Sequence, residues 1–382
     1  MASGFTFGFS GDDVDIDESD AQFDGGYVEN QDRTSQDREQ NRPLIEAKRW
    51  DGEEWLSTLP SQISYNKLSI PSSNSKDVIA LGRREVFDIR TQLMAEDDND
   101  NDELISGLEE GDLRPNFYEG GFKTWECALD LAKMMAGEEG RELLDDNSDA
   151  KDVHIIEVGA GSAMPSLSIF AQLLSRPKTH SSRRVHFTFA DYNDAVLRLV
   201  TVPNLLLTWK LNSPNQTTES TGGEETDEKE EEELDTDPSL IESFRADLRD
   251  RSITIDFISG AWSPEFVELA LTGRQDRGNN DDARSWRTLI LASETIYSPS
   301  SLGAFSETLL SLLRRCGPGT TAGSETRGLV AAKKVYFGVG GGVDEFLAVL
   351  NEMAGQAVEV QQRVEVKTEG VGRVVLQVKV AS

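Results

Sequence analysis

The chain has 382 residues, enough for one large or two ordinary domains with a substantial buried core. Its formal net charge of -31 argues against duplex nucleic acid as a direct partner and favours a basic one, although acidic segments that only keep the chain soluble would give the same charge. Two cysteines, Cys127 and Cys316, form no CxxC pair, and we see no secretory leader and no apolar run of about 18 residues, so we expect a soluble intracellular protein without membrane contact.

Composition divides the chain into zones. We expect an acidic, disordered tail over residues 1–43 and an extension over residues 44–95 that packs on the core. Residues 96–112 are rich in Asp and Glu and predict an acidic linker. Residues 113–382 predict the main domain, and we expect its acidic residues 211–238 to form a surface insertion because they are too polar to bury a core.

The main domain alternates short apolar segments with helical ones. The apolar segments are rich in β-branched and aromatic residues, as parallel strands buried on both faces should be. These predicted strands cover residues 153–158, 185–190, 253–259, 288–293 and 329–337.

Two helices and a hairpin are predicted near the carboxyl end. Residues 301–315 and 343–355 space their apolar side chains at helical intervals, and Gly355 is a natural helix end. Residues 357–367 and 372–380 alternate with period two around a short turn, which predicts an antiparallel hairpin. Five βα units followed by such a hairpin resemble the Rossmann-like, seven-strand α/β sheet of class I S-adenosylmethionine-dependent methyltransferases, whereas the sheet of an NAD-binding fold would stay parallel.

Small residues follow the first predicted strand, at the position where such folds bind their cofactor. Glu157, Gly159 and Gly161 resemble the acidic-x-Gly-x-Gly turn of these methyltransferases and imply a site for S-adenosyl-L-methionine. Ala163 replaces the third glycine of that pattern, and because alanine does not easily take a positive φ, we expect a different turn there. Asp191 follows the second strand, where it would accept hydrogen bonds from ribose hydroxyls or, alternatively, cap the next helix.

Two further strand ends carry candidate site residues. After the third strand, Trp262 offers an apolar face for adenine, although a place in the core would explain it nearly as well. After the fourth strand, Glu294 and Tyr297 match the acidic-x-x-Tyr motif of protein-methylating members of this fold, and we expect them to shape the substrate pocket. Lysine-modifying relatives share this motif, so the motif does not specify the target amino acid.

Longer strings of sequence are similar to one family within this fold. "SETIYSP" (293–299), "NFYEGGFKTWECALDLAKMM" (116–135) and "AAKKVYFGVGGGVDEF" (331–346) all resemble the protein-histidine N-methyltransferase family. The resemblance implies methylation of one histidine of ribosomal protein L-three of the large subunit, at the tele nitrogen of its imidazole. We accordingly expect a monomer that meets this basic protein in the cytoplasm and nucleus.

By the same resemblance, a defined set of residues lines the cofactor pocket. The family commonly has an acidic residue before the tryptophan, and Ala261 in its place would leave only a backbone group to hold adenine. Residues 338–342, "GVGGG", are expected to line the substrate site unless they form only a flexible turn. The implied cofactor residues are Thr124, Trp125, Glu126, Cys127, Ala128, Gly159, Asp191, Tyr192, Asn193, Gly260, Ala261, Trp262 and Ser293.

The implied reaction needs little from the protein. The sulfonium activates its own methyl group, so the site must hold a neutral imidazole in line with it and exclude water. A carboxylate such as Glu294 would bind the proton of one ring nitrogen and leave the other nitrogen free to react, or it would only orient Tyr297. The chain's own histidines, His154, His180 and His186, lack metal-ligand spacing, so we expect no metal. Two alternatives stay open, namely lysine methylation by the same fold and a non-catalytic acidic escort of a basic protein.

Overall fold

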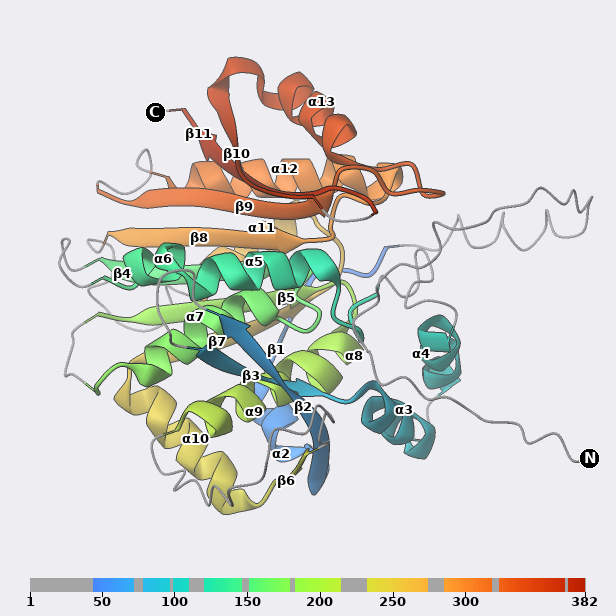
Figure 1. The fold of residues 1–382 in the computed structure, drawn as a ribbon, viewed down its shortest axis with the longest axis vertical. Helices are drawn as coiled ribbons and strands as arrows, with labels where there is room; N and C mark the ends of the chain where they lie inside the picture. The colour runs from blue at the N-terminus through green and yellow to red at the C-terminus, as the bar shows by residue number, and fades with distance from the viewer. Residues whose placement is uncertain are drawn as a thin grey trace, which may run out of the picture.

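The computed structural model describes residues 44–71, 78–96, 99–109, 120–145, 151–178, 183–213, 232–273, 285–317, 323–367 and 370–381. Its centre is an eight-stranded sheet with helices on both faces (Figure 1). The strand order is β1-β7-β5-β4-β8-β9-β11-β10. The strands are β1 (Lys48–Trp50), β4 (Asp152–Val158), β5 (Val185–Asp191), β7 (Ile253–Ser259), β8 (Trp286–Ser293), β9 (Glu325–Lys333), β10 (Val358–Val366) and β11 (Arg373–Val380).

The sheet confirms the predicted fold class. Strands β4, β5, β7, β8 and β9 run parallel, and the hairpin β10–β11 completes the sheet antiparallel to β9. Strand β1 adds an eighth strand, antiparallel to β7. One predicted boundary was wrong, because β9 ends at Lys333 rather than at residue 337. The apolar residues that follow leave the sheet, and Val335 bridges back to Gly342 in a separate hairpin.

Helices cover both faces of the sheet because side chains alternate along each strand. Ile155 and Phe187 pack with residues of α5, α7 and α9, whereas Ile156 and Ile258 pack with residues of α11 and α12. Figure 1 shows α5 in front of the strands and α12 behind them. These helices and those beside them are α5 (Glu126–Ala136), α6 (Glu138–Leu143), α7 (Met164–Ser175), α8 (Asp194–Val196), the π-helix η2 (Leu197–Thr201), α9 (Val202–Asn212), α10 (Pro238–Asp250), α11 (Pro264–Thr272), α12 (Pro299–Cys316), α13 (Val343–Ala354) and the 3-10 helix η4 (Gly355–Ala357).

A second, three-stranded sheet joins the N-terminal extension to the main domain. Helix α2 (Gly52–Ser57) precedes β2 (Gln62–Pro71) and β3 (Val78–Arg84), and the third strand is β6 (Glu232–Asp235). Strand β6 lies within residues 211–238, so this part of the predicted surface insertion pairs with β2 and buries Leu234. The sequence did not predict this strand, because three of its four residues are acidic.

A helix occupies much of the predicted linker over residues 96–112. Helix α4 (Asn99–Glu109) packs against α3 (Val86–Ala95), and its Leu104 and Leu108 are buried in a cluster with Ile89 and Leu93. The linker prediction was therefore wrong for these residues, because two leucines four positions apart share one helix face. The predicted tail, residues 1–43, lies outside the described residues.

No helix among the described residues is both long and apolar enough to cross a bilayer. In the same ranges no group of three or more His, Cys, Asp or Glu side chains is placed to hold a metal ion, and His180 lies outside these ranges. Cys127 and Cys316 are buried, and no disulfide joins them.

Candidate functional site

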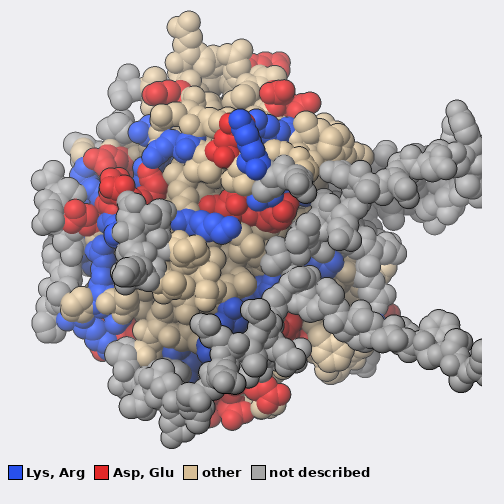
Figure 2. Space-filling model, viewed as in Figure 1, with Lys and Arg blue, Asp and Glu red and all other residues tan. Residues whose placement is uncertain are grey.

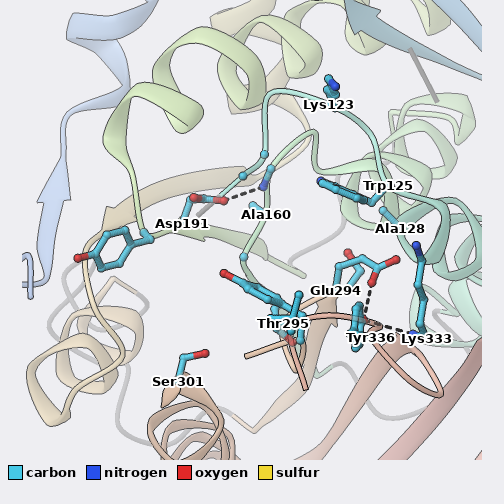
Figure 3. Close-up of a pocket in the computed structure, with 18 of the residues that line it drawn as sticks. Lys123, Trp125, Ala128, Ala160, Asp191, Glu294, Thr295, Ser301, Lys333 and Tyr336 are labelled. Carbon is cyan, nitrogen blue, oxygen red and sulfur yellow. Dashed lines mark hydrogen bonds between the residues drawn. The ribbon is translucent and has the colours of Figure 1, made fainter. Parts of the chain in front are cut away.

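A cavity of about 350 Å³ lies at the carboxyl ends of the parallel strands. Its wall contains the turn after β4, residues at the ends of β5, β7, β8 and β9, and the start of α5. This edge of the sheet is where open α/β folds bind ligands, and the volume suits a small organic molecule. Figure 3 shows Asp191 on one side of the cavity and Glu294, Tyr336 and Lys333 together on the other.

The cavity brings together site residues that the sequence predicted from separate segments. Each predicted segment contributes at least one of them, from the start of α5 to the residues after β8. Their roles toward a ligand stay predictions. The predicted residues that line the cavity are Trp125, Ala128, Gly159, Gly161, Asp191, Tyr192, Ala261, Trp262, Ser293, Glu294 and Tyr297.

The turn after β4 brings the backbone to the edge of the cavity. Gly159 and Gly161 have φ angles of 68° and 50°, in the left-handed region that favours glycine. The expectation for Ala163 was wrong, because it is also left-handed, with φ 59° and ψ 22°, and it is fully buried at the start of α7. The turn therefore keeps the backbone of the glycine pattern, and the alanine bears a strain of about 1–2 kcal/mol.

Asp191 ties this turn to the end of β5. Its Oδ2 accepts the N–H of Gly161 over 2.9 Å, and its Oδ1 accepts the N–H of Asn193 over 3.3 Å. Asn193, not Asp191, is the N-cap residue of α8. The carboxylate of Asp191 also lines the cavity, so it is placed to accept hydrogen bonds from hydroxyl groups of a ligand.

The N-terminal extension forms part of the cavity wall near Ala261 and Trp262. The N–H of Ala261 donates to the carbonyl oxygen of Ile45 over 2.8 Å. This backbone donor, which the sequence predicted as a group to hold adenine, therefore already has a partner in the N-terminal extension. The ring of Trp262 lies 5.1 Å from that of Phe305, and Leu44 completes this part of the wall. Trp262 therefore has both the core contact and the cavity-facing position that the sequence left as alternatives.

Two donors hold Glu294 on the opposite wall. Its Oε1 accepts the N–H of Cys127 over 3.3 Å, and its Oε2 accepts the hydroxyl of Tyr336. Burial raises the pKa of Glu294, although the two hydrogen-bonded neighbours and the ammonium of Lys333 oppose the rise. Burial and the charge of Glu294 raise the pKa of Tyr336 well above its usual value, so its hydroxyl remains a donor. The ring of Tyr297 lies 6.3 Å from that of Tyr336.

Several predicted cofactor residues lie behind the cavity wall. Glu157 is buried in β4, where its Oε2 accepts the N–H of Ser166 over 3.0 Å, and burial raises its pKa to about 8. Glu126 forms an ion pair with Arg373 at 2.9 Å. Adjacent residues of a strand or helix point in different directions, so the neighbours of lining residues need not line the cavity themselves. The full set outside the wall is Thr124, Glu126, Cys127, Glu157, Asn193 and Gly260.

The sequence prediction missed lining residues that follow β9. Lys333, Val335, Tyr336 and Phe337 line the cavity, but residues 329–337 are apolar enough to have been predicted as one strand. If the end of β9 at Lys333 had been predicted, their position at and just after a strand end would have made them candidate site residues. Val339, from the predicted substrate segment, also lines the cavity. The other missed residues are Leu44, Gly120, Gly121, Lys123, Ala160, Ser162, Thr295, Ser300, Ser301, Ala304 and Val371.

Known proteins resemble the chain over most of its length. No protein-family model matches it. It is 34% identical over 376 residues to histidine protein methyltransferase 1 of Saccharomyces cerevisiae, and the match covers 91% of this chain and 90% of that protein. The Schizosaccharomyces pombe protein of the same name is 33% identical over 326 residues, and that match covers 83% of this chain and 80% of the relative. Among solved structures, TrmK of M. capricolum in complex with S-adenosyl-homocysteine has a TM-score of 0.28 and 8% identity, covering 63% of this chain and 67% of its own.

Proposed function

The chain belongs to the histidine protein methyltransferase family, which uses S-adenosyl-L-methionine to methylate a protein histidine, and from this membership we propose that its target is a histidine of large-subunit ribosomal protein L-three, modified at the tele nitrogen. The observation that best supports an imidazole as the methyl acceptor is the carboxylate of Glu294. Two donors hold it in the wall of the cavity that also contains Asp191 and the glycine turn. A single fixed acceptor of this kind suits a ring with one N–H.

The cavity wall fits S-adenosyl-L-methionine. Gly159 and Gly161 bring their backbone to the cavity, and a Cβ at Gly159 would come within 2.8 Å of the side chain of Thr295. Asp191 would accept hydrogen bonds from the ribose, and Trp262 would offer its face to adenine. The cofactor supplies a methyl group that its sulfonium already activates.

The chain's own part is to hold a neutral imidazole beside that methyl group. Glu294 would accept the N–H of the pros nitrogen, which fixes the tautomer that leaves a lone pair on the tele nitrogen. The tele nitrogen is the one farther from the target's backbone, so it reaches into a narrow cavity with less crowding. As the new N–CH₃ bond forms, the S–CH₃ bond would break with its electron pair remaining on the sulfur, and the ring would become positive. The pros N–H bond would then break with its proton passing to Glu294. The raised pKa of Glu294 makes it a better acceptor for this proton than an ordinary carboxylate.

The charge of the chain suits a basic substrate. Residues 1–43 contain eleven Asp and Glu against three Lys and Arg, and residues 214–231 contain seven against one. On the described face of Figure 2, Lys and Arg side chains lie among Asp and Glu side chains. The acidic excess is therefore greatest in segments outside the described residues, and it would attract a basic ribosomal protein over a distance. We propose that this encounter takes place in the cytoplasm or nucleus.

Mass spectrometry of recombinant L-three, incubated with the enzyme and S-adenosyl-L-methionine, tests the proposal. We expect methylhistidine at one site, with the methyl group on the tele nitrogen. Methyllysine would favour lysine methylation by the same fold, and no methyl transfer would exclude L-three as the substrate.

Substitution of the carboxylate tests the mechanism. Glu294→Gln should lower kcat at least about 100-fold, since it removes the proton acceptor, while calorimetry finds the affinity for S-adenosyl-L-methionine within about threefold of wild type. Glu352→Gln, on the exposed side of α13, is a matched control that should keep full activity. Unchanged methylation by Glu294→Gln would contradict the role of Glu294.

A further inference from the structure

Exposed apolar side chains gather at the mouth of the cavity. Among the described residues nine large hydrophobic side chains are exposed, and four of these line the cavity. These four, which we call the apolar rim, are Leu44, Val335, Phe337 and Val339, with exposed fractions of 63%, 48%, 68% and 45%. A cluster of this kind beside a site commonly marks a surface where another molecule binds.

Three of the four rim residues come from a hairpin over residues 334–342 that the fold holds firmly. The N–H of Tyr336 donates to Gly341 over 3.1 Å, and the N–H of Gly340 donates to Tyr336 over 3.2 Å. Gly341 packs so closely on Tyr297 that a Cβ would overlap the backbone carbonyl there. The hairpin therefore keeps its apolar side chains in contact with water, which is unfavourable for the free protein.

Side chains of this hairpin alternate in direction and connect the rim to the reacting centre. The hydroxyl of Tyr336 reaches inward to Glu294, whereas its neighbours Val335 and Phe337 are exposed. A polypeptide that rests on Val335 and Phe337 would thus place a nearby side chain beside Glu294. Contact with the rim would position the target histidine so that Glu294 can accept its ring N–H.

We propose that the apolar rim binds the substrate polypeptide and selects a segment with an apolar side chain within about three residues of the target histidine, because Val335 and Phe337 adjoin Tyr336, whose hydroxyl reaches Glu294, and an extended chain advances about 3.3 Å per residue. The proposal rests on histidine methylation, not on L-three as the substrate. The acidic segments would act over a distance, whereas the rim acts in contact and sets the register of the bound chain.

Two synthetic histidine peptides test the rim. They differ only in an apolar or a polar residue within three positions of the histidine, and the readouts are KM, kcat and the affinity for S-adenosyl-L-methionine. For the wild type, KM of the apolar peptide should be about tenfold lower. The double substitution Phe337→Ser and Val339→Ser should remove this difference by raising the KM of the apolar peptide about tenfold. Phe87→Ser, whose side chain is 78% exposed on α3, is the matched control and should keep the preference.

Equal KM values for the two peptides with the wild type, or a preference that survives the double substitution, would overturn the proposal. Calorimetry of the same peptides with enzyme loaded with S-adenosylhomocysteine needs no turnover, and it should show the same tenfold preference. Methylation of L-three, measured separately, decides the proposed substrate, so the two proposals can fail independently.

The chain's own N-terminal segment is the competing occupant, because residues 1–43 join the rim at Leu44. The substrate is the better match, because the rim and Glu294 line the same cavity and Tyr336 connects them. Deletion of residues 1–43 should therefore leave the tenfold peptide preference unchanged. If the deletion lowers KM for both peptides tenfold, and if the double substitution abolishes that effect, the segment occupies the rim and the proposal is wrong.

Discussion

Glu157 allows a quantitative test of how the glycine turn is supported. The substitution Glu157→Gln keeps the shape of the side chain and an acceptor for the N–H of Ser166, but it removes an ionisable group that is 1% exposed. Burial raises the pKa of Glu157 from 4.5 to about 8, and the side-chain oxygen Oε1 has no hydrogen-bond partner among the described residues. The folded protein therefore favours the protonated carboxyl group.

The magnitude follows from the two pKa values. Between pH 4.5 and pH 8 the folded chain holds a proton on Glu157 that the unfolded chain has lost, so the free energy of unfolding decreases as the pH rises. The slope for one such proton is about 1.4 kcal/mol per pH unit. From pH 5 to pH 7.5 the wild type should lose about 3 kcal/mol that Glu157→Gln retains. The new amide group adds a constant offset, which does not affect this slope.

Urea unfolding of both proteins at pH 5 and pH 7.5 measures the effect. Glu242→Gln is the control, because Glu242 is exposed and Arg249 lowers its pKa, so it stays ionised over this range and its difference from wild type should be constant. If the difference in the free energy of unfolding between wild type and Glu157→Gln is the same at the two pH values, the reasoning is refuted. Because Glu157 lies behind the cavity wall, the affinity for S-adenosyl-L-methionine should stay within about threefold of wild type.

Three further variants test the turn, the hairpin and the carboxylate. Ala163→Gly relieves a backbone strain of about 1–2 kcal/mol, but it loses a buried methyl group and raises the entropy of the unfolded chain, and these two costs are of similar total size. Calorimetry should therefore find the cofactor affinity within about threefold of wild type. Clear tightening would show that the alanine compromises the turn. Gly341→Ala should lower methylation at least about tenfold because its Cβ overlaps a backbone carbonyl. Gly303→Ala, within α12, meets open space and should keep full activity, so equal activities of the two variants would contradict the packing. Tyr336→Phe removes a donor that lowers the pKa of Glu294, so the acid limb of the kcat profile should move to higher pH, and an unmoved limb would argue against this contact.

The fold could be predicted wherever local pattern was strong. Strands buried on both faces form short apolar runs, and the hairpin at the carboxyl end alternates with period two, so both were confirmed. Helix α4 and strand β6 were missed because each has only one or two buried apolar residues among acidic ones. Leu108 is buried against α3, and Leu234 lies on the strand that pairs with β2. Composition contains neither of these contacts.

By itself, the sequence determined the fold class, the family and the glycine turn, because these depend on contiguous motifs and on the period of apolar residues. Only the tertiary structure decided which side chains face the cavity. Gly159 lines it and Glu157 does not, although they are two residues apart, and Tyr336 reaches Glu294 only because β9 ends at Lys333. The physical reason is that the direction of a side chain depends on where its strand ends and on what packs against it, and both are set by segments far along the chain.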